Sequence, residues 1–432
     1  MSNTLFNNHP LTNNSNQYFY EKKYVSISSI DRDFSKYPNS AEFEVTFPQE
    51  YLNVVSARLY NWSFPANYNV FSNFINNVTM QFKFDTLFNP GSTDPLLEGI
   101  FAALDYNIGN KYTIIIETGF YNPLQMATEL TNKFNEVVTS YINTFFANNQ
   151  PTYATAQSLF KKYDRFVIVY NTVSQKLWFG NRADQFTLTN DSDIYVHTSI
   201  NNSCIKKNFI PDYYNWGLPG YLGFSKCDAV ATSVAEILVS DPNAATTNAS
   251  LDVTLKVPRF YYGDANLGSS GMPSGDEGFW LYPIEPSSTV YFIQAPFKIS
   301  FMGQSYIYME VDGMNCIDET VPWNLSEYTI RNNKTNGIVN SSFAKIGVMS
   351  TPIAQWFDGD SAPYKYWNPP AERLSKLKVK LRYHNGQLVD FGQFEYSFMI
   401  ELSILKPQQE RIYSIKDAKN LAQIQSYDSA WM

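Results

Sequence analysis

Two alternating runs near the C-terminal end of the chain constrain its fold more than any other stretch. Apolar and basic residues alternate from Lys376 to Tyr383, and every second residue from Tyr396 to Ile404 is apolar. Successive side chains of a β-strand point to opposite faces, so each run predicts a strand with one buried face. Between them, Asn385-Gly386 suits a tight turn with positive φ at both central residues. The stretch 368–405 therefore predicts an antiparallel hairpin that closes a sheet.

Short strand-like segments bounded by turn residues recur through the rest of the chain. They lie at 24–30, 43–47, 51–64, 78–84, 112–117, 165–170, 176–179, 280–284, 289–293, 297–301, 306–311 and 342–348. The segment 112–117 is a continuous apolar run that predicts a strand buried on both faces, and 86–110 is interpreted as a loop.

Helical patterns are few. After a capping Asn122 and Pro123, apolar residues recur at spacings of three and four through about residue 146, and 415–425 has a helical composition. The predicted fold is therefore mainly β, a jelly-roll-like sandwich or sandwiches, with one long helix at about 122–146 and a short C-terminal helix.

Changes of composition predict five regions. Residues 1–16 are rich in Asn and predict a flexible arm, 17–224 a β-rich half with the helix, and 225–290 an insertion with a flexible loop. Residues 291–406 supply strands that close the sandwich, and 407–432 form the C-terminal helix and tail.

Composition restricts the class of protein. The net charge of −8 argues against a protein that wraps nucleic acid, for which a basic surface is expected. The three cysteines are widely spaced and odd in number, which fits a reducing compartment better than a disulfide framework. There is no stretch of about 18 apolar residues and no signal-like N-terminus, so we expect neither a membrane span nor secretion. The 31 Tyr and 32 Phe fit either extensive contact surfaces or an aromatic β core.

No catalytic or metal-binding pattern is present in the sequence. His9, His197 and His384 are far from one another and from the cysteines, and no nucleophile elbow, phosphate loop or dinucleotide motif occurs. Asp276-Glu277 and Asp358 with Asp360 are acid pairs of a kind that occurs by chance in a chain of this length. We therefore predict no enzyme activity, no cofactor and no metal site.

Two groups of residues are candidates for contact with neighbours. The first is a basic stripe, for which a solvated face of an edge strand is the preferred interpretation and an acidic subunit or anionic membrane the alternative. The second consists of aromatic residues in proline-containing, loop-like surroundings. The stripe is Lys376, Lys378, Lys380 and Arg382, and the aromatic candidates are Tyr213, Tyr214, Trp216, Tyr261, Tyr262, Tyr366 and Trp367.

A resemblance to a known family rests on the segment VSISSIDRDFSKYPNSAEFEVTFPQEYLNVVSARLYNWSFPANYNVF at 25–71. An Asp-Arg-Asp turn precedes Tyr-Pro-Asn-Ser, a short strand, and a segment with Tyr, Asn-Val and an aromatic-Pro pair. The order strand, Gly119-Phe120-Tyr121 turn, helix, hairpin, Leu222-Gly223-Phe224 then follows. This arrangement resembles minor capsid proteins of the large icosahedral DNA viruses of eukaryotes. The matching residues are Asp31, Arg32, Asp33, Tyr37, Pro38, Asn39, Phe43, Pro48, Tyr51, Asn53, Val54 and Pro65.

The resemblance implies a structural role. We expect a non-enzymatic minor capsid (cement) protein in the virion that links capsomers of the major capsid protein, contacts other minor capsid proteins, and assembles in the host cytoplasm. An inner membrane surface and further copies of the chain remain open as partners, and no specific nucleic acid is expected. The alternatives are a penton or vertex capsid protein and a carbohydrate-binding or glycan-processing β-sandwich protein.

Overall fold

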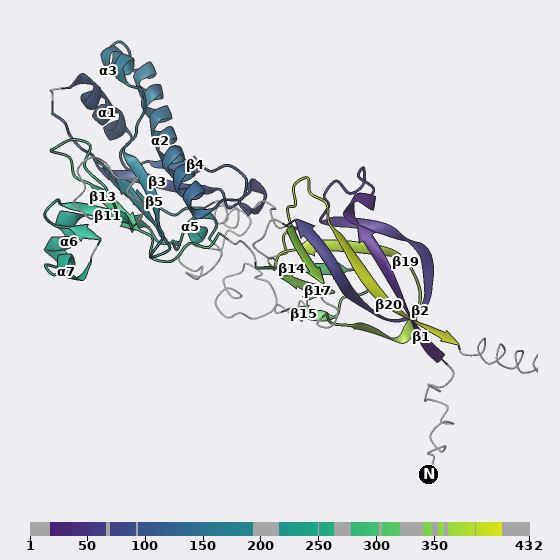
Figure 1. Cartoon of the computed structure of the whole chain (residues 1–432). Helices are drawn as coiled ribbons and strands as arrows, with labels where there is room; N and C mark the ends of the chain where they lie inside the picture. The colour runs from purple at the N-terminus through teal and green to yellow at the C-terminus, as the bar shows by residue number, and fades with distance from the viewer. Residues whose placement is uncertain are drawn as a thin grey trace, which may run out of the picture. The chain divides into compact units, whose positions relative to one another are not determined.

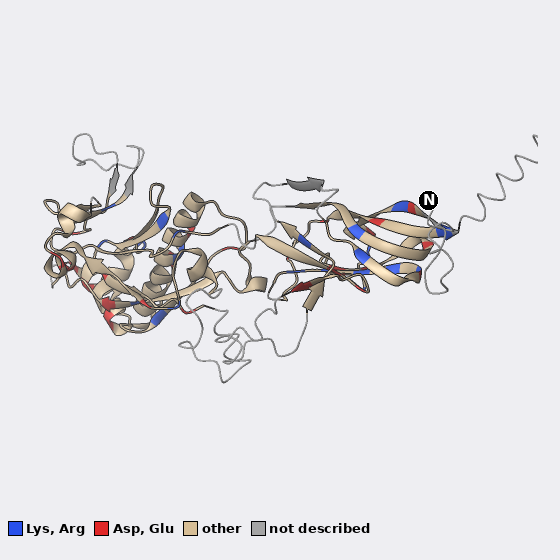
Figure 2. Ribbon diagram, turned by 90° about the horizontal axis from the view of Figure 1, so that it is seen from below, with Lys and Arg blue, Asp and Glu red and all other residues tan. Residues whose placement is uncertain are grey.

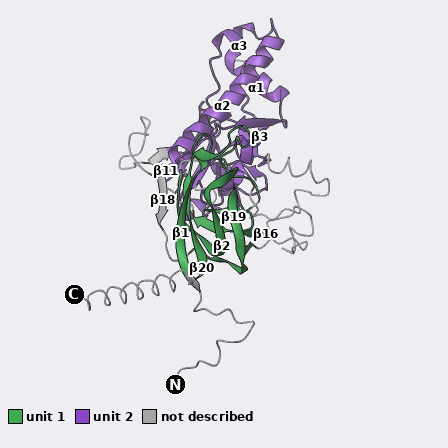
Figure 3. Ribbon diagram, turned by 90° about the vertical axis from the view of Figure 1, so that its right-hand side faces the viewer, with its two compact units in different colours: residues 1–68, 304–322, 337–432 green, residues 69–303, 323–336 purple. Residues whose placement is uncertain are grey.

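The computed structural model describes residues 18–65, 70–91, 94–192, 216–248, 250–262, 278–301, 305–319, 340–347, 353–357, 362–384 and 386–407. The predicted N-terminal arm and C-terminal helix lie outside these ranges. The chain divides into two compact units, shown in two colours in Figure 3. Unit 1 contains the described residues 18–65 and those from 305 onward, whereas unit 2 contains 70–301.

Unit 1 is built from long antiparallel strands (Figure 1). Its sheet has the order β1-β20-β2-β19-β14-β17, and β18 also pairs with β2. The strands are β1 (Tyr18–Ser28), β2 (Glu42–Pro65), β14 (Tyr306–Val311), β17 (Ala344–Gly347), β18 (Ile353–Phe357), β19 (Lys365–Arg382) and β20 (Ser397–Pro407). A short pair, β15 (Ile317–Glu319) and β16 (Asn340–Ser342), and the 3-10 turn η3 (Ser29–Asp31) complete it.

The sheet of unit 1 folds into two layers because β2 bends. Phe43 and Phe64 lie near opposite ends of β2, yet both rings contact Tyr396, at centroid distances of 6.1 and 5.0 Å. A straight strand would separate them by roughly 70 Å at about 3.3 Å per residue. β2 pairs with β19 along its first half, and from Val54 onward it also pairs with β20, with register shifts on either side of Ser56–Leu59. Such irregularities bend a strand, and here they place the apolar faces of the two halves against one core.

The predicted hairpin between the two alternating runs is wrong, because β2 lies between β19 and β20. The turn at Gly386 closes only a local bridge, in which the Tyr383 amide donates to the Gln387 carbonyl at 2.8 Å. The chain then enters the core, where Val389 and Phe391 are buried, before β20 begins. Alternation indicates which side chains are buried but does not identify the neighbouring strand.

Unit 2 contains two four-stranded sheets and a small three-stranded one. The first has the order β4 (Lys111–Ile115), β3 (Thr79–Thr86), β7 (Gln185–Leu188), β8 (Ala229–Val230). The second has the order β5 (Phe166–Asn171), β6 (Lys176–Asn181), β13 (Tyr291–Gln294), β9 (Thr232–Ser233). The third is β10 (Leu251–Asp252), β11 (Val257–Tyr262) and β12 (Gly278–Trp280).

The predicted long helix is confirmed as α2 (Pro123–Asn148). The Asn122 side chain accepts from the Gln125 amide, and the Gln125 side chain accepts from the Asn122 amide, so both orphan donors are satisfied. The Phe134 ring of α2 lies 4.6 Å from Phe82 of β3 and 5.8 Å from Phe179 of β6. α2 therefore joins both sheets in one core. No helix among the described residues is long and apolar enough to cross a membrane.

Two local predictions in unit 2 are wrong. The expected loop at 86–110 contains α1 (Pro95–Tyr106), which the Asp94 side chain caps. It packs on α3 (Ala154–Leu159) and α2, where Gly99 lies against Ala156 and Phe146. The segment 112–117, predicted to be buried on both faces, forms the terminal strand β4, and its Ile115 side chain is exposed.

The predicted boundary between residues 224 and 225 lies inside unit 2, which is continuous in the described chain from 70 to 301. Segment 225–290 supplies β8 and β9 to the two main sheets, and its Ala231 is buried in the shared core. Helices α6 (Val234–Ser240) and α7 (Ala244–Thr247) help cover the outer face of β6 around Trp178. The remaining short elements are η4 (Asn73–Ile75) and α5 (Leu218–Tyr221). Of the predicted flexible loop at 263–278, residues 263–277 lie outside the described residues, and Gly278 is the first residue of β12.

Candidate interaction surfaces

The outer face of the layer β1-β20-β2 in unit 1 carries a group of tyrosines. Side chains of Tyr20, Lys22 and Tyr24 share this face because residues of a strand two apart point the same way. In register with Tyr24 are Glu401 on β20 and then Arg58 on β2. We call the group the tyrosine surface; its rings are Tyr20, Tyr24, Tyr60, Tyr364 and Tyr366. Figure 2 shows Lys and Arg residues together with Asp and Glu residues on the strands near the label N.

An ion cluster lies beneath the tyrosine surface. The Glu401 carboxylate accepts a hydrogen bond from Arg58 Nη2 at 3.0 Å and forms an ion pair with Lys22 Nζ, also at 3.0 Å, and its side chain is 1% exposed. Burial disfavours the charged carboxylate, but the hydrogen bonds from Lys22 and Arg58 outweigh it, so the pKa of Glu401 lies below its ordinary value. The same carboxylate raises the pKa of Lys22. Glu401 thus stays ionised, although it lies in a sheet face that tyrosine rings cover.

Four of the five rings, those of Tyr24, Tyr60, Tyr364 and Tyr366, are held by contacts with another ring, and several of the rings remain accessible. Tyr24 and Tyr60 make an edge contact at 4.9 Å, Tyr364 and Tyr366 stack at 5.7 Å, and the Arg58 guanidinium lies 4.7 Å from the Tyr364 ring centre. Tyr20 and Tyr366 are each 70% exposed and Tyr24 is 49% exposed. Tyrosines that are fixed yet exposed, with arginine among them, have the composition of protein interface hot spots.

A second surface lies at the end of β1, in the segment that carries the family resemblance. Arg32 is buried and donates to three backbone carbonyls, those of Ser29 at 2.7 Å, Tyr37 at 3.0 Å and Pro38 at 3.5 Å. Its guanidinium also pairs with the Glu395 carboxylate. We call residues 29–40, fixed in this way, the clamped loop.

Other residues of the resemblance also shape the backbone. The Asp33 carboxylate accepts from the Ser35 and Lys36 amides, and the Asn39 side chain accepts from the Ala41 amide at 2.8 Å. Asn53 has a φ of +53° where β2 changes partners, a conformation that Asn adopts more readily than most residues. The motif therefore encodes a rigid loop and a bent strand, not a reactive group.

The clamped loop presents apolar side chains to solvent. Ile30 is 58% exposed, Phe34 is 54% exposed, and Phe394 from the adjoining turn is 46% exposed. The Ser40 hydroxyl donates to the Phe394 carbonyl at 3.3 Å, which holds the turn against the loop. Asp31 and Asp33 are exposed in the same loop, and neither forms an ion pair with any residue that the structure describes.

The predicted basic stripe does not form a free face. Lys376 pairs with Glu44 at 3.1 Å, and Lys378 pairs with Glu42 at 3.6 Å. Lys380 lies in register between Glu310 and Glu42 on the flanking strands. β19 is an internal strand, so the interpretation of an edge strand is wrong.

Arg382, the last residue of that stripe, is buried and pairs with Glu310 and Glu319. Burial lowers the pKa of Arg382, but the hydrogen bonds that it donates to these carboxylates outweigh this effect and raise the pKa. Arg382 is therefore an internal charge and takes no part in an exposed surface.

The aromatic candidates have different environments. Tyr366 belongs to the tyrosine surface, and Trp367 beside it is half-buried. Trp216 is 2% exposed and donates to the Asn190 carbonyl, so it is a core residue. Tyr261 and Tyr262 lie in β11, but their side chains, like all of Tyr213 and Tyr214, lie outside the described structure.

Sequence reasoning missed Tyr20, Tyr24 and Tyr60. The available signal was the spacing of Tyr20, Lys22 and Tyr24 at every second position, in a strand that begins at Tyr18, earlier than predicted. The exposed members of the clamped loop carried no such pattern.

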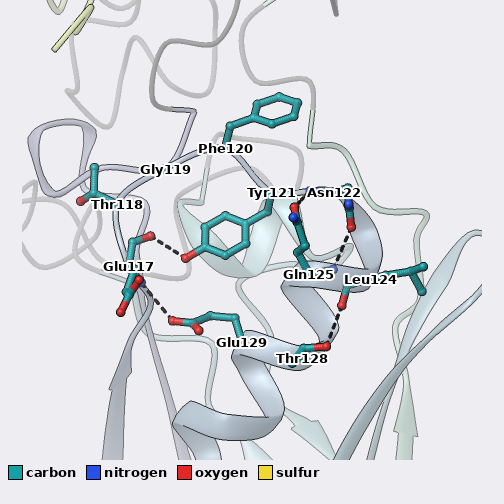
Figure 4. A pocket seen from close by; sticks show the side chains of 10 residues that line it. All are labelled: Glu117, Thr118, Gly119, Phe120, Tyr121, Asn122, Leu124, Gln125, Thr128 and Glu129. Carbon is teal, nitrogen blue, oxygen red and sulfur yellow. Dashed lines mark hydrogen bonds between the residues drawn. The ribbon is translucent and has the colours of Figure 1, made fainter. Parts of the chain in front are cut away.

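Unit 2 has an open pocket of about 560 Å³ at the start of α2, lined by residues from Glu117 to Glu129 (Figure 4). The Tyr121 hydroxyl donates to the Glu117 carbonyl at 2.8 Å, and the Glu117 amide donates to Glu129 at 3.2 Å. Burial and the two carboxylates raise the pKa of Tyr121 to about 12. These polar groups bond to one another, and no cluster of potential metal ligands occurs among the described residues. We assign no chemistry to this pocket.

Comparison with known proteins gives a similarity in sequence to a capsid protein. No family model matches the chain. A stretch of 105 residues, 23% of this chain, is 30% identical to the penton capsid protein P1 of Paramecium bursaria Chlorella virus 1, and it spans 54% of that relative, about half its length.

Two solved structures overlap loosely with the chain. The mavirus penton protein gives a TM-score of 0.34 at 8% identity, over 89% of this chain and 100% of that one. A chain of the Sputnik virophage structure gives 0.35 at 9%, over 89% and 98%. These TM-scores are too low to bear on the fold. The similarity in sequence confirms the resemblance read from the motifs: this chain is similar to a capsid protein of a large algal DNA virus.

Proposed function

We propose that this protein is a penton, or vertex, subunit of an icosahedral virus capsid. The supporting observation is the 30% identity over 105 residues to a penton capsid protein. Because the matched stretch is about half of that relative, the assignment to the whole chain is our inference. We therefore prefer the penton alternative to the cement role between capsomers, because no comparison supports the cement role.

The described structure is suited to a role in assembly. Unit 1 holds three buried charges, Arg32, Arg382 and Glu401, in ion pairs and leaves aromatic rings exposed on the strands and the loop that these residues belong to or adjoin. A subunit that binds with surfaces fixed in advance loses little conformational entropy on assembly. Repeated contacts of modest area then add up through multivalency.

The pocket at the start of α2 does not provide the site that the glycan-processing alternative needs. This alternative requires two carboxylates flanked by stacked tryptophans in an open groove. The pocket at the start of α2 contains Glu117 and Glu129, but no tryptophan lines it.

The test is localisation in the purified particle. A cryo-EM reconstruction focused on the fivefold vertices is expected to contain density that fits units 1 and 2 docked separately. Density for the chain between capsomers across the facets would instead support the cement role. Absence of the chain from purified particles, by quantitative mass spectrometry with the major capsid protein as the internal control, would reject both.

A further inference from the structure

The two exposed surfaces of unit 1 have opposite character. The clamped loop carries Ile30, Phe34, the carboxylates of Asp31 and Asp33, and the exposed ammonium of Lys36, which lies 5.0 Å from the Tyr37 ring centre. The tyrosine surface carries rings and Lys22, whose side chain is 54% exposed, and the carboxylate that the described structure places on this face, that of Glu401, is buried. The clamped loop is therefore apolar with two exposed carboxylates against one exposed lysine, and the tyrosine surface is aromatic with two cations, Lys22 and Arg58, against the one carboxylate of Glu401.

β1 connects these surfaces. It runs from Tyr18 to Ser28, with Tyr20 near its start and the clamped loop directly after its end. At about 3.3 Å per residue, Tyr20 and Ile30 lie roughly 30 Å apart. One copy therefore cannot bring its own two surfaces together, but two copies can.

We propose that the clamped loop of one copy docks on the tyrosine surface of another copy of this chain. Ile30 and Phe34 contact the exposed rings, and Asp31 and Asp33 lie near Lys22. Complementary charge selects this pairing, since two clamped loops would bring carboxylates together and two tyrosine surfaces would bring lysines together. Contacts between two different surfaces repeat from copy to copy and close into a ring when the rotation between neighbouring copies is a whole fraction of a turn. The inference deepens the proposed function and rests on it for the identity of the partner as a second copy.

The test uses the full chain in solution. The loop variant is Ile30→Ser with Phe34→Ser, and the surface variant is Tyr20→Ser with Tyr366→Ser. Sedimentation velocity over a concentration series is expected to show self-association of the wild-type protein, with the Kd raised tenfold or more in each variant. A matched control, Tyr106→Ser with Val239→Ser, changes side chains that are 78% and 85% exposed in unit 2 and is expected to associate like the wild type.

An equimolar mixture of the two variants is the decisive measurement. The surface variant keeps an intact clamped loop, and the loop variant keeps an intact tyrosine surface. The mixture is therefore expected to form heterodimers through one contact between these two surfaces, with the affinity that this contact has in the wild type. A mixture that stays monomeric, or single variants that associate normally, would overturn the proposal. Circular dichroism and thermal melts show whether each variant is folded.

These outcomes are separate from those of the proposed function. If the chain is found at the vertices but these substitutions do not change its self-association, only the proposed docking surfaces are refuted. If the chain is absent from particles but the two variants still associate when mixed, only the assignment to the vertex is refuted.

Discussion

At the scale of single residues, Glu401 shows how a charge can be stable in the outer face of a sheet. Its carboxylate is nearly inaccessible, yet two cations contact it and tyrosine rings surround it. Removing one partner of a buried ion pair leaves the other uncompensated, which costs more than the pair contributes when intact. The tyrosine surface therefore depends on an internal charge network.

We expect Glu401→Gln to lower the free energy of unfolding at pH 7 by about 2–4 kcal/mol, because Arg58 would keep its charge with little access to water. Chemical denaturation monitored by tryptophan fluorescence measures this. The control is Glu50→Gln, which breaks an exposed pair with Arg373 and should cost less than about 0.5 kcal/mol. Equal effects of the two substitutions would contradict a role for burial.

The same substitution has a defined pH dependence. The pKa of Glu401 is lowered in the folded state, so its contribution is fully present above the pKa of an unfolded glutamate, about 4.3, and is lost as the pH falls through the folded value. The stability difference between wild type and Glu401→Gln should therefore be largest near neutral pH and shrink below about pH 4. A difference that grows on acidification would show that the sign is wrong.

Arg32 tests whether the clamped loop depends on guanidinium geometry. Lysine keeps the charge near Glu395 but cannot reach the carbonyls of Ser29, Tyr37 and Pro38 at once. We expect Arg32→Lys to destabilise unit 1 by about 2–3 kcal/mol and to speed hydrogen exchange in 29–40. Arg373→Lys, at an exposed position, is the matched control, and a loop that exchanges at the wild-type rate in Arg32→Lys would refute the clamp.

At this scale the sequence predicted burial correctly where the alternation of a strand determines it. It failed where burial depends on contacts with residues distant in sequence. Leu377, Val379 and Leu381 are buried as the alternation requires. Arg382 occupies the same exposed register as Lys376, yet it is buried because Glu310 and Glu319, distant in sequence, approach it. No local pattern contains that information.

At the scale of elements, strand and helix identity followed from sequence more readily than strand neighbours. The cap and apolar stripe of α2 are local, so the sequence specified that helix closely. The pairing of β19 and β20 with β2 depends on contacts across the whole of unit 1, and the Asn-Gly turn was compatible with a hairpin that does not form. α1 was missed because its apolar face is short and its helical form depends on packing against α2 and α3.

The bend of β2 predicts a conformational requirement at Asn53. Its side chain is exposed and its φ is +53°, so a substitution there acts mainly through the backbone. Asn53→Val should destabilise unit 1 by about 1–2 kcal/mol, because β-branched residues avoid this region. Asn53→Gly is the matched control and should unfold at nearly the wild-type denaturant concentration; a Gly variant as unstable as the Val variant would point to a lost side-chain contact.

The interior of unit 2 makes a similar prediction at Gly180 in β6. A Cβ at this position would lie 2.4 Å from side-chain atoms of Leu281 and Phe260, so segment 225–290 must move to admit it. We expect Gly180→Ala to lower the stability of unit 2 by about 1–3 kcal/mol in denaturant titrations. Gly119→Ala, which meets no atom within 4 Å, should change it little, and a neutral Gly180→Ala would mean that the packing there is looser than described.

At the scale of the whole molecule, the chain is organised differently from the five predicted regions. Unit 1 is assembled from the two ends of the described chain, and unit 2 is a continuous stretch between β2 and β14. Composition placed boundaries where polar and glycine-rich residues gather, but a boundary depends on which contacts cross it. The polar run after residue 225 lies at the surface of unit 2 and still contributes strands to its sheets.

This organisation predicts two folding units, of which unit 2 can fold without the rest of the chain and unit 1 needs both ends of the chain. Unit 2 has its own cores, and residues 70–301 supply all strands of both of its main sheets, so this segment should fold when it is expressed alone. A fragment that ends at residue 65 should not fold, because it lacks β20, the partner of β1, and β19, a partner of β2. Unfolding of the segment should be a single cooperative transition in calorimetry, and the full chain should show that transition together with a second one. Glu401→Gln should shift only the second transition, and Gly180→Ala only the one shared with the segment. An isolated segment without cooperative unfolding, or two variants that shift both transitions equally, would mean that the chain folds as one unit.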